Sequence, residues 1–355
     1  MPVQGRYPYI RKDDLIIPEE KKQQSKQLRV AVIGAGGWGY QHARAFWSRK
    51  DTQLAAIVGR TAQRTQERAD VFQVPWYLDI REMLEKEKPD FVSVCLPAQH
   101  TFEATMTVIE AGIPLMSEKP LAYRLEEARE LTARAEEKKL FYAIDFNQRY
   151  SIPCLKAKQD IDAGRLGRPV FAHWRFGHGW DTQLLDHPYL NLIEAQCHGL
   201  DLLEHLCGPI RSCMAEMTDN GGRNSYSSFT LSLRFENGAV GSFLATLDAN
   251  EHNRLSQLIE IGGTDGRILI EDNVRSYTFQ ATESEMAETW QAGFFEDGLR
   301  SFGHNLDRHL DALIPALLAG QEPPVPARRG LRALELAYAA IESFQTGRRI
   351  EVKAD

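Results

Sequence analysis

The order of apolar and polar positions divides the chain into two parts. Between about residues 28 and 145, short apolar runs typical of buried strands alternate with segments whose apolar residues recur at helical spacing. The expected strands are 28–34, 54–59, 90–97, 113–117 and 141–145, and the expected helices are 38–48, one beginning at 61, 101–112 and 125–138. Because the connections are short, this alternation predicts a parallel sheet with helices on its faces.

After Tyr150 the pattern changes to an alternation of apolar and polar residues. Turn-forming sequences such as Glu236-Asn237-Gly238 separate the alternating segments. These segments are 169–176, 227–235, 239–248, 256–263 and 267–272. The pattern is typical of antiparallel strands that have one covered face. We also expect a helix over 331–344 and a short strand over 348–352.

Composition narrows the class of protein further. The chain has 355 residues, too many for one ordinary hydrophobic core, so we expect two domains. The net charge of -7 argues against nucleic acid and against an anionic membrane surface as partners. The five cysteines form no CxxC pair, and this usage is typical of a reducing compartment. Because the sequence has neither a secretory signal nor a stretch apolar enough to span a membrane, we expect a cytoplasmic protein.

A glycine-rich turn joins the first expected strand to the first expected helix. The run from Gly34 to Gly39, GAGGWG, matches GxGxxG in the strand–turn–helix context that dinucleotide-binding folds require. Gly34 allows the tight turn, Gly36 lets a pyrophosphate approach the backbone, and Gly39 lets the helix pack closely on the strand. The alternative is a plain glycine-rich turn, which the strand–turn–helix context disfavours.

The motif completes the expected architecture, which is α/β. It consists of a Rossmann dinucleotide-binding domain over 28–150 and an α+β domain over 151–355 that has a large, mostly antiparallel sheet. A polar arm over 1–27 precedes both domains. We expect the second domain to hold the substrate and to mediate assembly.

The adenosine end of the cofactor site is expected just after the second strand. An acidic residue about 20 positions beyond the glycine motif would bind the ribose 2′-hydroxyl of NAD. This chain has Gly59 at that position, with Arg60 and Arg64 following. A glycine beside arginines suits a 2′-phosphate, so the sequence favours NADP over NAD. The alternative is that both arginines are ordinary solvated residues at the start of a helix.

A charged pair ends the apolar run 113–117. Glu118 and Lys119 follow it directly, and Pro120 prevents further strand hydrogen bonds. The carboxyl end of a parallel strand is where such sheets bind ligands. A lysine at that place would stabilise a developing alkoxide or polarise a carbonyl. The alternative is a surface salt bridge between the two residues, which is disfavoured because adjacent strand residues point to opposite faces.

A second group of polar residues falls on one expected helix, which would begin with Asn191 as its N-cap and end before Gly208. At helical spacing, Glu194, His198, Asp201 and His205 share one face of it. Glu194 would otherwise form a capping box with Asn191, and His198 would otherwise be a hydrogen-bonded core histidine. We favour catalysis for His198, with Glu194 or Asp201 orienting its ring. We expect no metal, because the sequence has no HExxH motif.

The glycine at position 199, in the middle of that helix, indicates that something approaches closely there. Aromatic and polar residues precede the helix and follow the first sheet. Aromatic rings stack on polyhydroxylated ligands, while acids and imidazoles bind hydroxyls. The residues that we expect to contact such a ligand are Arg149, Tyr150, Trp174, His178, Trp180, Asp181, Asp201 and His304. The alternative for 173–190 is an ordinary connecting loop.

These motifs together resemble the glucose-fructose oxidoreductase/inositol dehydrogenase (Gfo/Idh/MocA) family. The resemblance rests on the GxGxxG strand, the turn LPAQH over 96–100, the segment EAGIPLMSEKPLA over 110–122 and DFNQRY over 145–150. It runs from about residue 28 to the C-terminus. The EKP segment, Glu118-Lys119-Pro120, is specific in this context, whereas many families share the glycine motif.

The resemblance implies an NAD(P)-dependent oxidoreductase that moves a hydride between nicotinamide and a hydroxyl or carbonyl of a sugar, glycoside or cyclitol. It implies that Lys119 reaches the reacting oxygen, often across a cis Lys-Pro bond, and that His198 and Glu194 complete the catalytic group. The family pattern has aspartate where this chain has Glu194. The expected cofactor contacts are Gly34, Gly36, Gly37, Trp38, Gly39, Arg60, Arg64, Pro97, Glu118 and Lys119.

Two other functions stay open at this point. Some relatives keep the cofactor permanently bound and use it in sugar–sugar oxidoreduction or glycoside cleavage, and a non-catalytic dinucleotide sensor would need only the fold. Lys119 together with His198 favours the enzyme. The family commonly oligomerises through the open face of its second sheet, so we expect at least a dimer here.

Overall fold

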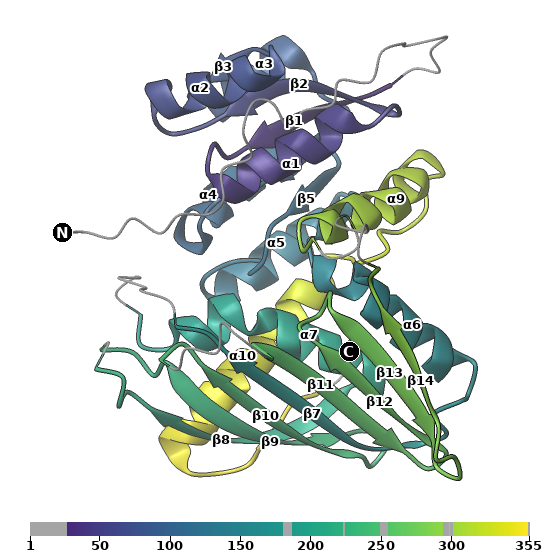
Figure 1. Ribbon diagram of the computed structural model, residues 1–355. Helices are drawn as coiled ribbons and strands as arrows, with labels where there is room; N and C mark the ends of the chain where they lie inside the picture. The colour runs from purple at the N-terminus through teal and green to yellow at the C-terminus, as the bar shows by residue number, and fades with distance from the viewer. Residues whose placement is uncertain are drawn as a thin grey trace, which may run out of the picture.

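The computed structural model describes residues 27–179, 187–222, 224–248, 255–293, 298 and 301–353 (Figure 1). The polar arm lies outside the described residues except for Gln27, and so do Trp180 and Asp181. Within the described part of the chain, the strands form two separate sheets. No helix in these ranges combines the length and the apolar character needed to cross a membrane.

The first sheet is a parallel sheet of six strands in the order β3-β2-β1-β4-β5-β6. This order is that of the Rossmann dinucleotide-binding fold, so the expected first domain type is confirmed. The strands are β1 (Leu28–Ile33), β2 (Thr52–Val58), β3 (Trp76–Tyr77), β4 (Phe91–Val94), β5 (Leu115–Ser117) and β6 (Tyr142–Ile144). The helices between them are α1 (Gly37–Ser48), α2 (Ala62–Phe72), α3 (Ile80–Glu87), α4 (Thr101–Glu110) and α5 (Leu125–Glu137).

Local chemistry explains where these elements begin and end. All residues of β4 and β5 are buried, as expected for strands that have helices on both sides. Asp79 caps α3, because its carboxylate accepts the Glu82 N–H at 2.8 Å. Gly112, with φ at +71°, ends α4 in the left-handed conformation that favours glycine.

The second sheet has nine strands in the order β14-β13-β12-β11-β7-β10-β9-β8-β15. Neighbouring strands are antiparallel except β7 and β10, which run parallel. The strands are β7 (Pro169–Gly177), β8 (Ile210–Thr218), β9 (Ser228–Phe235), β10 (Val240–Thr246), β11 (Gln257–Gly263), β12 (Gly266–Glu271), β13 (Ser276–Ala281), β14 (Ala287–Gln291) and β15 (Ile350–Glu351). The mostly antiparallel sheet is confirmed, but the sequence pattern missed β8, β13 and β14.

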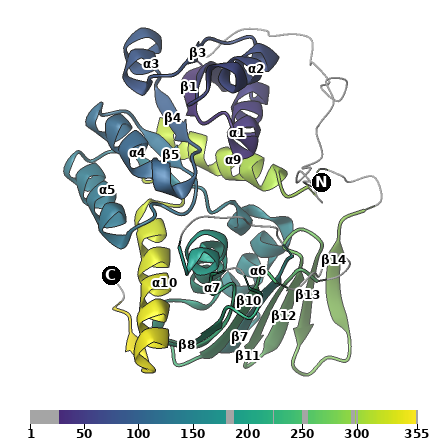
Figure 2. The same cartoon turned by 90° about the vertical axis from the view of Figure 1, so that its left-hand side faces the viewer.

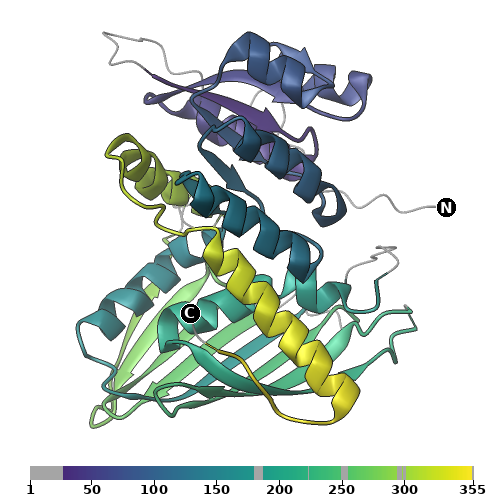
Figure 3. The ribbon, with the colours of Figure 1, turned by 180° about the vertical axis from the view of Figure 1, so that it is seen from behind.

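Helices line one face of this sheet. α6 (Ile152–Asp162), α7 (Cys197–Cys207) and α10 (Arg328–Thr346) lie between the two sheets (Figures 2 and 3). Burial alternates along β9 accordingly, with Phe229 and Leu231 buried and Thr230 exposed between them. The opposite face of the sheet carries large exposed apolar residues, namely Phe171, Met214, Val240 and Leu244.

Helix α9 (His304–Leu318) returns from the second half of the chain to the first sheet. Its buried apolar residues join the hydrophobic cluster that contains Val30 of β1 and Phe46 of α1. These residues are Leu306, Leu310, Leu313 and Ile314. Figure 1 shows α9 above the second sheet and close to the strand ends of the first. Side chains from both halves of the sequence therefore meet at the carboxyl edge of the parallel sheet.

Candidate active site

The glycine turn between β1 and α1 is shaped by close backbone contacts on one side and open space on the other. A Cβ on Gly34, whose φ is +141°, would lie 2.1 Å from the carbonyl oxygen of Cys95, and one on Gly39 would lie 2.0 Å from the oxygen of Gly34. Around Gly36 and Gly37, by contrast, an added Cβ would meet nothing within 4 Å. Gly36 is the N-cap residue of α1, and no side chain of a described residue caps the helix. The open, uncapped helix N-terminus fits a pyrophosphate.

The expected adenosine end has one specific contact. The Arg60 Nη1 lies 2.6 Å from the His100 Nε2, and His100 belongs to the short 3-10 turn η2 (Ala98–His100) that follows Pro97. Arg64 is exposed on α2. Gly59 has a packing reason for its identity, since a Cβ there would lie 2.2 Å from the Thr65 Oγ1. The absence of an acid at this position therefore has a structural cause as well as a possible role in cofactor choice.

Glu118 and Lys119 leave β5 in different directions. Glu118 is 8% exposed, and its Oε1 lies 3.1 Å from the His42 Nε2. Its Oε2 accepts the backbone N–H of Lys119 at 3.1 Å, and the Lys119-Pro120 peptide is cis. The Lys119 ammonium donates to the carbonyl oxygen of Glu194 at 3.3 Å. The two side chains therefore do not form the alternative surface salt bridge.

Burial and charge act on Lys119 in opposite directions. Burial disfavours its ammonium, but the negative groups around it more than compensate, so the pKa of Lys119 is raised above its ordinary value. Lys119 is consequently a cation at neutral pH. Its charge lies at the carboxyl edge of β5, where ligands of parallel sheets bind.

His198 of α7 faces this lysine. The ring is 7% exposed and makes an edge contact with Phe146, with 5.7 Å between the ring centroids. Burial, followed by the positive charge of Lys119, lowers the pKa of His198 to about 3. The imidazole is therefore neutral at pH 7. Its Nδ1 is buried and has no hydrogen-bond partner among the described residues.

Glu194 does not share a continuous helix with His198, which corrects the expected geometry. Residues Asn191–Ala195 form a π-helical turn (η4), and α7 begins only at Cys197. Asn191 is not an N-cap: its amide donates to the Ser227 carbonyl at 2.6 Å. The Oε2 of Glu194 is buried without a partner in the part of the chain that the structure describes. The turn brings the Glu194 carbonyl to Lys119 and leaves the carboxylate available.

Asp201 and Arg149 bind each other. The Arg149 guanidinium donates to both carboxylate oxygens of Asp201, at 2.6 and 2.5 Å. The Asp201 side chain is 1% exposed and the Arg149 side chain is 10% exposed. Asp201 is therefore held by Arg149, and within the described ranges no hydrogen bond joins it to the ring of His198. The pair ties α7 to the 3-10 turn η3 (Asn147–Tyr150) that follows β6.

The other expected ligand contacts are spread through the domain. Trp174 is buried in the core, which corrects the expectation that it contacts a ligand. It is 1% exposed, donates its N–H to the Gln196 Oε1 at 3.1 Å and stacks on Phe243. A Cβ on Gly199 would lie 2.5 Å from Trp174, so this packing explains the glycine in α7.

Three further expected residues lie near the strand ends or at α9. Tyr150 stacks on His309 of α9, with 4.5 Å between the centroids. His178 follows the end of β7 and is half-buried. His304 begins α9, and its Nδ1 lies 2.9 Å from the carbonyl oxygen of Gly298. Trp38 of the glycine turn makes an edge contact with Phe302, just before this helix.

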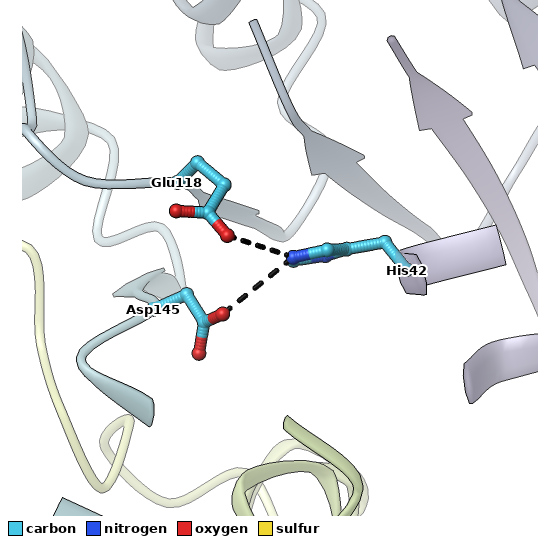
Figure 4. A group of neighbouring side chains, drawn as sticks. All are labelled: His42, Glu118 and Asp145. Carbon is cyan, nitrogen blue, oxygen red and sulfur yellow. Dashed lines mark hydrogen bonds and ion pairs between the residues drawn. The ribbon is translucent and has the colours of Figure 1, made fainter. Parts of the chain in front are cut away.

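Sequence reasoning missed three buried titratable residues that form one hydrogen-bonded network with Glu118. They are His42 of α1, Asp145 after β6 and His309 of α9. Figure 4 shows His42 pointing between the carboxylates of Glu118 and Asp145. Asp145 follows a buried strand just as Glu118 does, and this repeated pattern could have identified it. His42 and His309 stand among core residues of their helices, where nothing in the sequence distinguishes them.

An open glycine cradle on a Rossmann sheet, with a lysine cation and a neutral histidine at its edge, defines the class of nicotinamide-dependent oxidoreductases. Two family models match nearly the whole described chain. Residues 28–146 match "Oxidoreductase family, NAD-binding Rossmann fold", and residues 158–352 match "Oxidoreductase family, C-terminal alpha/beta domain". The chain belongs to the Gfo/Idh/MocA oxidoreductase family, as the motifs implied.

Similar proteins extend this comparison. D-glucoside 3-dehydrogenase of Escherichia coli (strain K12) is 34% identical over 145 residues, a match that spans 40% of this chain and 41% of that protein. Myo-inositol 2-dehydrogenase of Thermotoga maritima is 24% identical over 92% of this chain and 99% of its own length. Among solved structures, levoglucosan dehydrogenase in complex with NADH and levoglucosan has a TM-score of 0.83 at 20% identity and covers 93% of this chain and 100% of its own. At this identity the likeness shows the fold.

Proposed function

We propose that the chain transfers a hydride between a nicotinamide cofactor and a secondary hydroxyl, or the matching ketone, of a sugar, glycoside or cyclitol. One observation carries the proposal. The cation of Lys119 lies close to two buried polar groups that lack partners among the described residues, the His198 Nδ1 and the Glu194 Oε2. Buried polar atoms are normally hydrogen-bonded, so such a group indicates a ligand that supplies the missing partners.

Each of these residues has a distinct role in the proposed reaction. When bound, the nicotinamide supplies the hydride acceptor or donor. Lys119 holds a positive charge beside the reacting oxygen and stabilises the alkoxide as it forms. His198 is neutral and accepts the hydroxyl proton. The Glu194 carboxylate accepts a hydrogen bond from a neighbouring substrate hydroxyl, which orients the reacting carbon.

The names of the similar proteins support the substrate class. The relatives include a D-glucoside 3-dehydrogenase and a myo-inositol 2-dehydrogenase, whose names specify a glycoside and a cyclitol. A polyhydroxylated substrate also agrees with the polar groups of the site, since a carboxylate, an imidazole and an ammonium all form hydrogen bonds with hydroxyls. The permanently bound cofactor and the sensor remain as outcomes of the experiment below.

For the cofactor we propose NADP in preference to NAD. Gly59 supplies no carboxylate for the ribose 2′-hydroxyl. The Arg60 guanidinium and the His100 imidazole lie together just beyond the ends of β2 and β4. Such a pair suits a phosphate. NAD is the competing assignment, favoured by the family description and by NADH in the levoglucosan dehydrogenase complex.

We also propose that the chain forms at least a dimer through the open face of the second sheet. Phe171, Met214, Val240 and Leu244 are 37, 39, 51 and 38% exposed on that face. Several large apolar residues exposed on one face of a sheet favour an interaction site there. A second copy would cover them without any further partner.

The test uses the full chain with a panel of sugars, glycosides and cyclitols and with NAD and NADP, following the absorbance of the reduced nicotinamide. We expect turnover with at least one polyol, and Lys119→Met should lower kcat ~100-fold or more, as loss of an oxyanion-stabilising donor does. The control is Lys86→Met, which removes a lysine that is 59% exposed on α3. Near-normal turnover in Lys119→Met would overturn the mechanism.

The same preparation separates the alternatives. Protein that carries a nicotinamide spectrum after purification would assign the permanently bound cofactor. Dinucleotide binding without turnover on any substrate, and with no effect of Lys119→Met, would assign the sensor.

A further inference from the structure

A single buried imidazole joins three neighbouring strands of the first sheet at their carboxyl ends. His42 lies on α1, three residues after Gly39, and is fully buried. It contacts Ser93 of β4, Glu118 after β5 and Asp145 after β6. Figure 4 shows its ring edge directed at the two carboxylates. The proposed mechanism assigns no role to this residue.

The distances define which atom of His42 binds what. Its Nδ1 lies 2.8 Å from the Ser93 Oγ, and its Nε2 lies 3.1 Å from the Glu118 Oε1 and 3.5 Å from the Asp145 Oδ2. Burial disfavours a charged ring, but Cys95 and the two carboxylates together hold the pKa of His42 well above its ordinary value. His42 is thus an imidazolium that donates one hydrogen bond to Ser93 and shares the other proton between two acids.

Asp145 extends the network to the second half of the chain. Its other oxygen, Oδ1, lies 2.7 Å from the His309 Nδ1, and its Oδ2 also accepts the Asn147 amide at 3.0 Å. Burial alone would raise the pKa of Asp145, but hydrogen bonds from His309 and His42 hold it well below its ordinary value. The position of this carboxylate is therefore fixed from both sides.

The network reaches the proposed reacting groups through two short links. The Oε1 of Glu118 accepts a hydrogen bond from the ring of His42, and its Oε2 accepts one from the backbone N–H of Lys119. Both distances are 3.1 Å. The orientation of this carboxylate consequently sets where the Lys119 backbone lies. On the other side, Asp145 precedes Phe146, whose ring meets the edge of His198. Among the described residues, the Lys119 ammonium has one hydrogen bond, to the Glu194 carbonyl, so its backbone anchor matters.

We propose that His42 is a positioning residue, which acts through Glu118 to hold Lys119 at the distance from the substrate oxygen that turnover requires. This inference rests on the proposed function of Lys119. A displacement of about 1 Å in a reacting group can cost on the order of 100-fold in rate. An imidazolium between two carboxylates is suited to prevent such a displacement, because the two carboxylates would repel each other without it.

Two substitutions separate the two sides of the ring. In His42→Gln the side-chain amide takes the place of Nε2 and still donates to Glu118, whereas in His42→Asn it takes the place of Nδ1 and reaches only Ser93. We expect His42→Asn to lower kcat by ~10- to 100-fold, with KM and Kd for the dinucleotide changed less than about twofold. His42→Gln should keep most of the activity. A merely structural histidine would suffer equally from both changes.

A double-mutant cycle with Lys119→Met tests whether His42 acts through that lysine. If it does, His42→Asn should cause no further loss of kcat in the Lys119→Met background. Equal proportional losses in both backgrounds, or wild-type kcat in the folded His42→Asn protein, would overturn the inference. Failure of Lys119→Met itself to change turnover would instead overturn the proposed function, so the two failures are distinguishable.

A second variant and a metal analysis test the role of His42 independently. If His42→Asn does not fold, Glu118→Gln keeps the shape and removes the charge that accepts both hydrogen bonds. Glu118→Gln should lower kcat as much as His42→Asn does. In the Lys119→Met background it should cause no further loss of kcat. Because the donor atoms of His42, Glu118 and Asp145 lie within 4.8 Å of one another, they could also hold a cation. Stoichiometric metal in the purified protein, with activity lost on chelation, would replace the positioning role by a metal site.

Discussion

The two sheets of this protein place their polar groups by opposite rules. In the parallel sheet all residues of β4 and β5 are buried, and two buried acids lie just beyond strand ends, Glu118 after β5 and Asp145 after β6. In the nine-stranded sheet burial alternates along strands such as β9, so that one face packs on helices and the other is exposed. The first arrangement concentrates chemistry at an edge, and the second produces a broad surface.

The histidines of the two regions show the same contrast. His42 lies at the edge of the parallel sheet between two acids, and its pKa is raised. His198 lies on a helix that covers the antiparallel sheet, where burial and a nearby cation lower its pKa to about 3. One imidazole is therefore cationic and the other neutral at pH 7. The environment that each sheet provides decides which form is present.

The largest predicted effect on stability concerns the ion pair that joins the two regions. Asp201→Asn leaves the Arg149 guanidinium, whose side chain is 10% exposed, without its countercharge. Breaking a buried pair in this way costs roughly 3–5 kcal/mol of the free energy of unfolding. Denaturant unfolding measures the change. The control is Glu351→Gln, in a pair with Arg211 whose side chains are 62 and 63% exposed, where less than about 1 kcal/mol is expected. Similar small losses in both variants would show that the junction is not held by this pair.

The second prediction concerns the open face of the nine-stranded sheet. Val240→Glu combined with Leu244→Glu would bury two carboxylates in the proposed dimer contact, which should weaken association ~100-fold or more. Sedimentation velocity at micromolar concentration measures the effect as a shift from dimer to monomer. Val71→Glu, at a residue that is 37% exposed on α2, is the matched control in the other region. A monomeric parent protein, or a double variant that remains dimeric, would contradict the assignment.

Much of the fold was predictable because the responsible interactions are local in sequence. The glycine turn was identified since GxGxxG requires only the adjacent strand and helix, and Lys119 since a charge interrupts an apolar run. β13 was missed although Tyr277, Phe279 and Ala281 alternate with polar residues along it. β14 was missed because it is an edge strand whose residues are mostly exposed, so it carries little apolar pattern. β8 was missed although its burial alternates over most of its length, because Met214 places an apolar residue on the exposed face.

The parts of the site that depend on distant contacts were not predictable. The π-helical turn Asn191–Ala195 shifts Glu194 relative to His198, and no spacing rule for a regular helix anticipates it. Trp174 was assigned to the ligand because aromatic rings stack on polyhydroxylated molecules, yet its strand position points inward, as the buried Ala172 and Trp174 show. The His42 network joins residues up to 164 positions apart, so only the folded chain reveals it.

The third prediction concerns cofactor choice at Arg60, just after the carboxyl end of β2. Arg60→Ala should weaken NADP binding by ~10-fold or more, because a hydrogen bond to a charged group contributes about 1.5–3 kcal/mol. Binding of NAD should change less than twofold. Fluorescence titration with both dinucleotides measures the ratio, and Arg64→Ala tests the second expected arginine in the same way. An equal loss for both cofactors, or a parent protein that prefers NAD, would overturn the NADP assignment and leave the Rossmann fold untouched.

The smallest predicted effect is the acid sensitivity that a neutral buried histidine causes. The folded-state pKa of His198, about 3, lies below its ordinary value of 6.5. As the pH falls through 6.5, the unfolded chain gains a proton that the folded chain does not, so stability is full above this pH and is lost below it. Between about pH 7.5 and about pH 6, one such group lowers the free energy of unfolding by roughly 0.8 kcal/mol. His198→Asn should remove that part of the pH dependence, measured by denaturant unfolding at both values.

His205 of α7 is the matched control, because burial lowers its pKa to about 3 as well. His205→Asn should flatten the pH dependence by a similar amount while turnover stays normal, whereas His198→Asn should also abolish most of the turnover. An unchanged pH dependence in His198→Asn would mean that its ring is protonated in the folded protein. His198 would then resemble His42 rather than differ from it, and it could not accept the substrate proton at neutral pH.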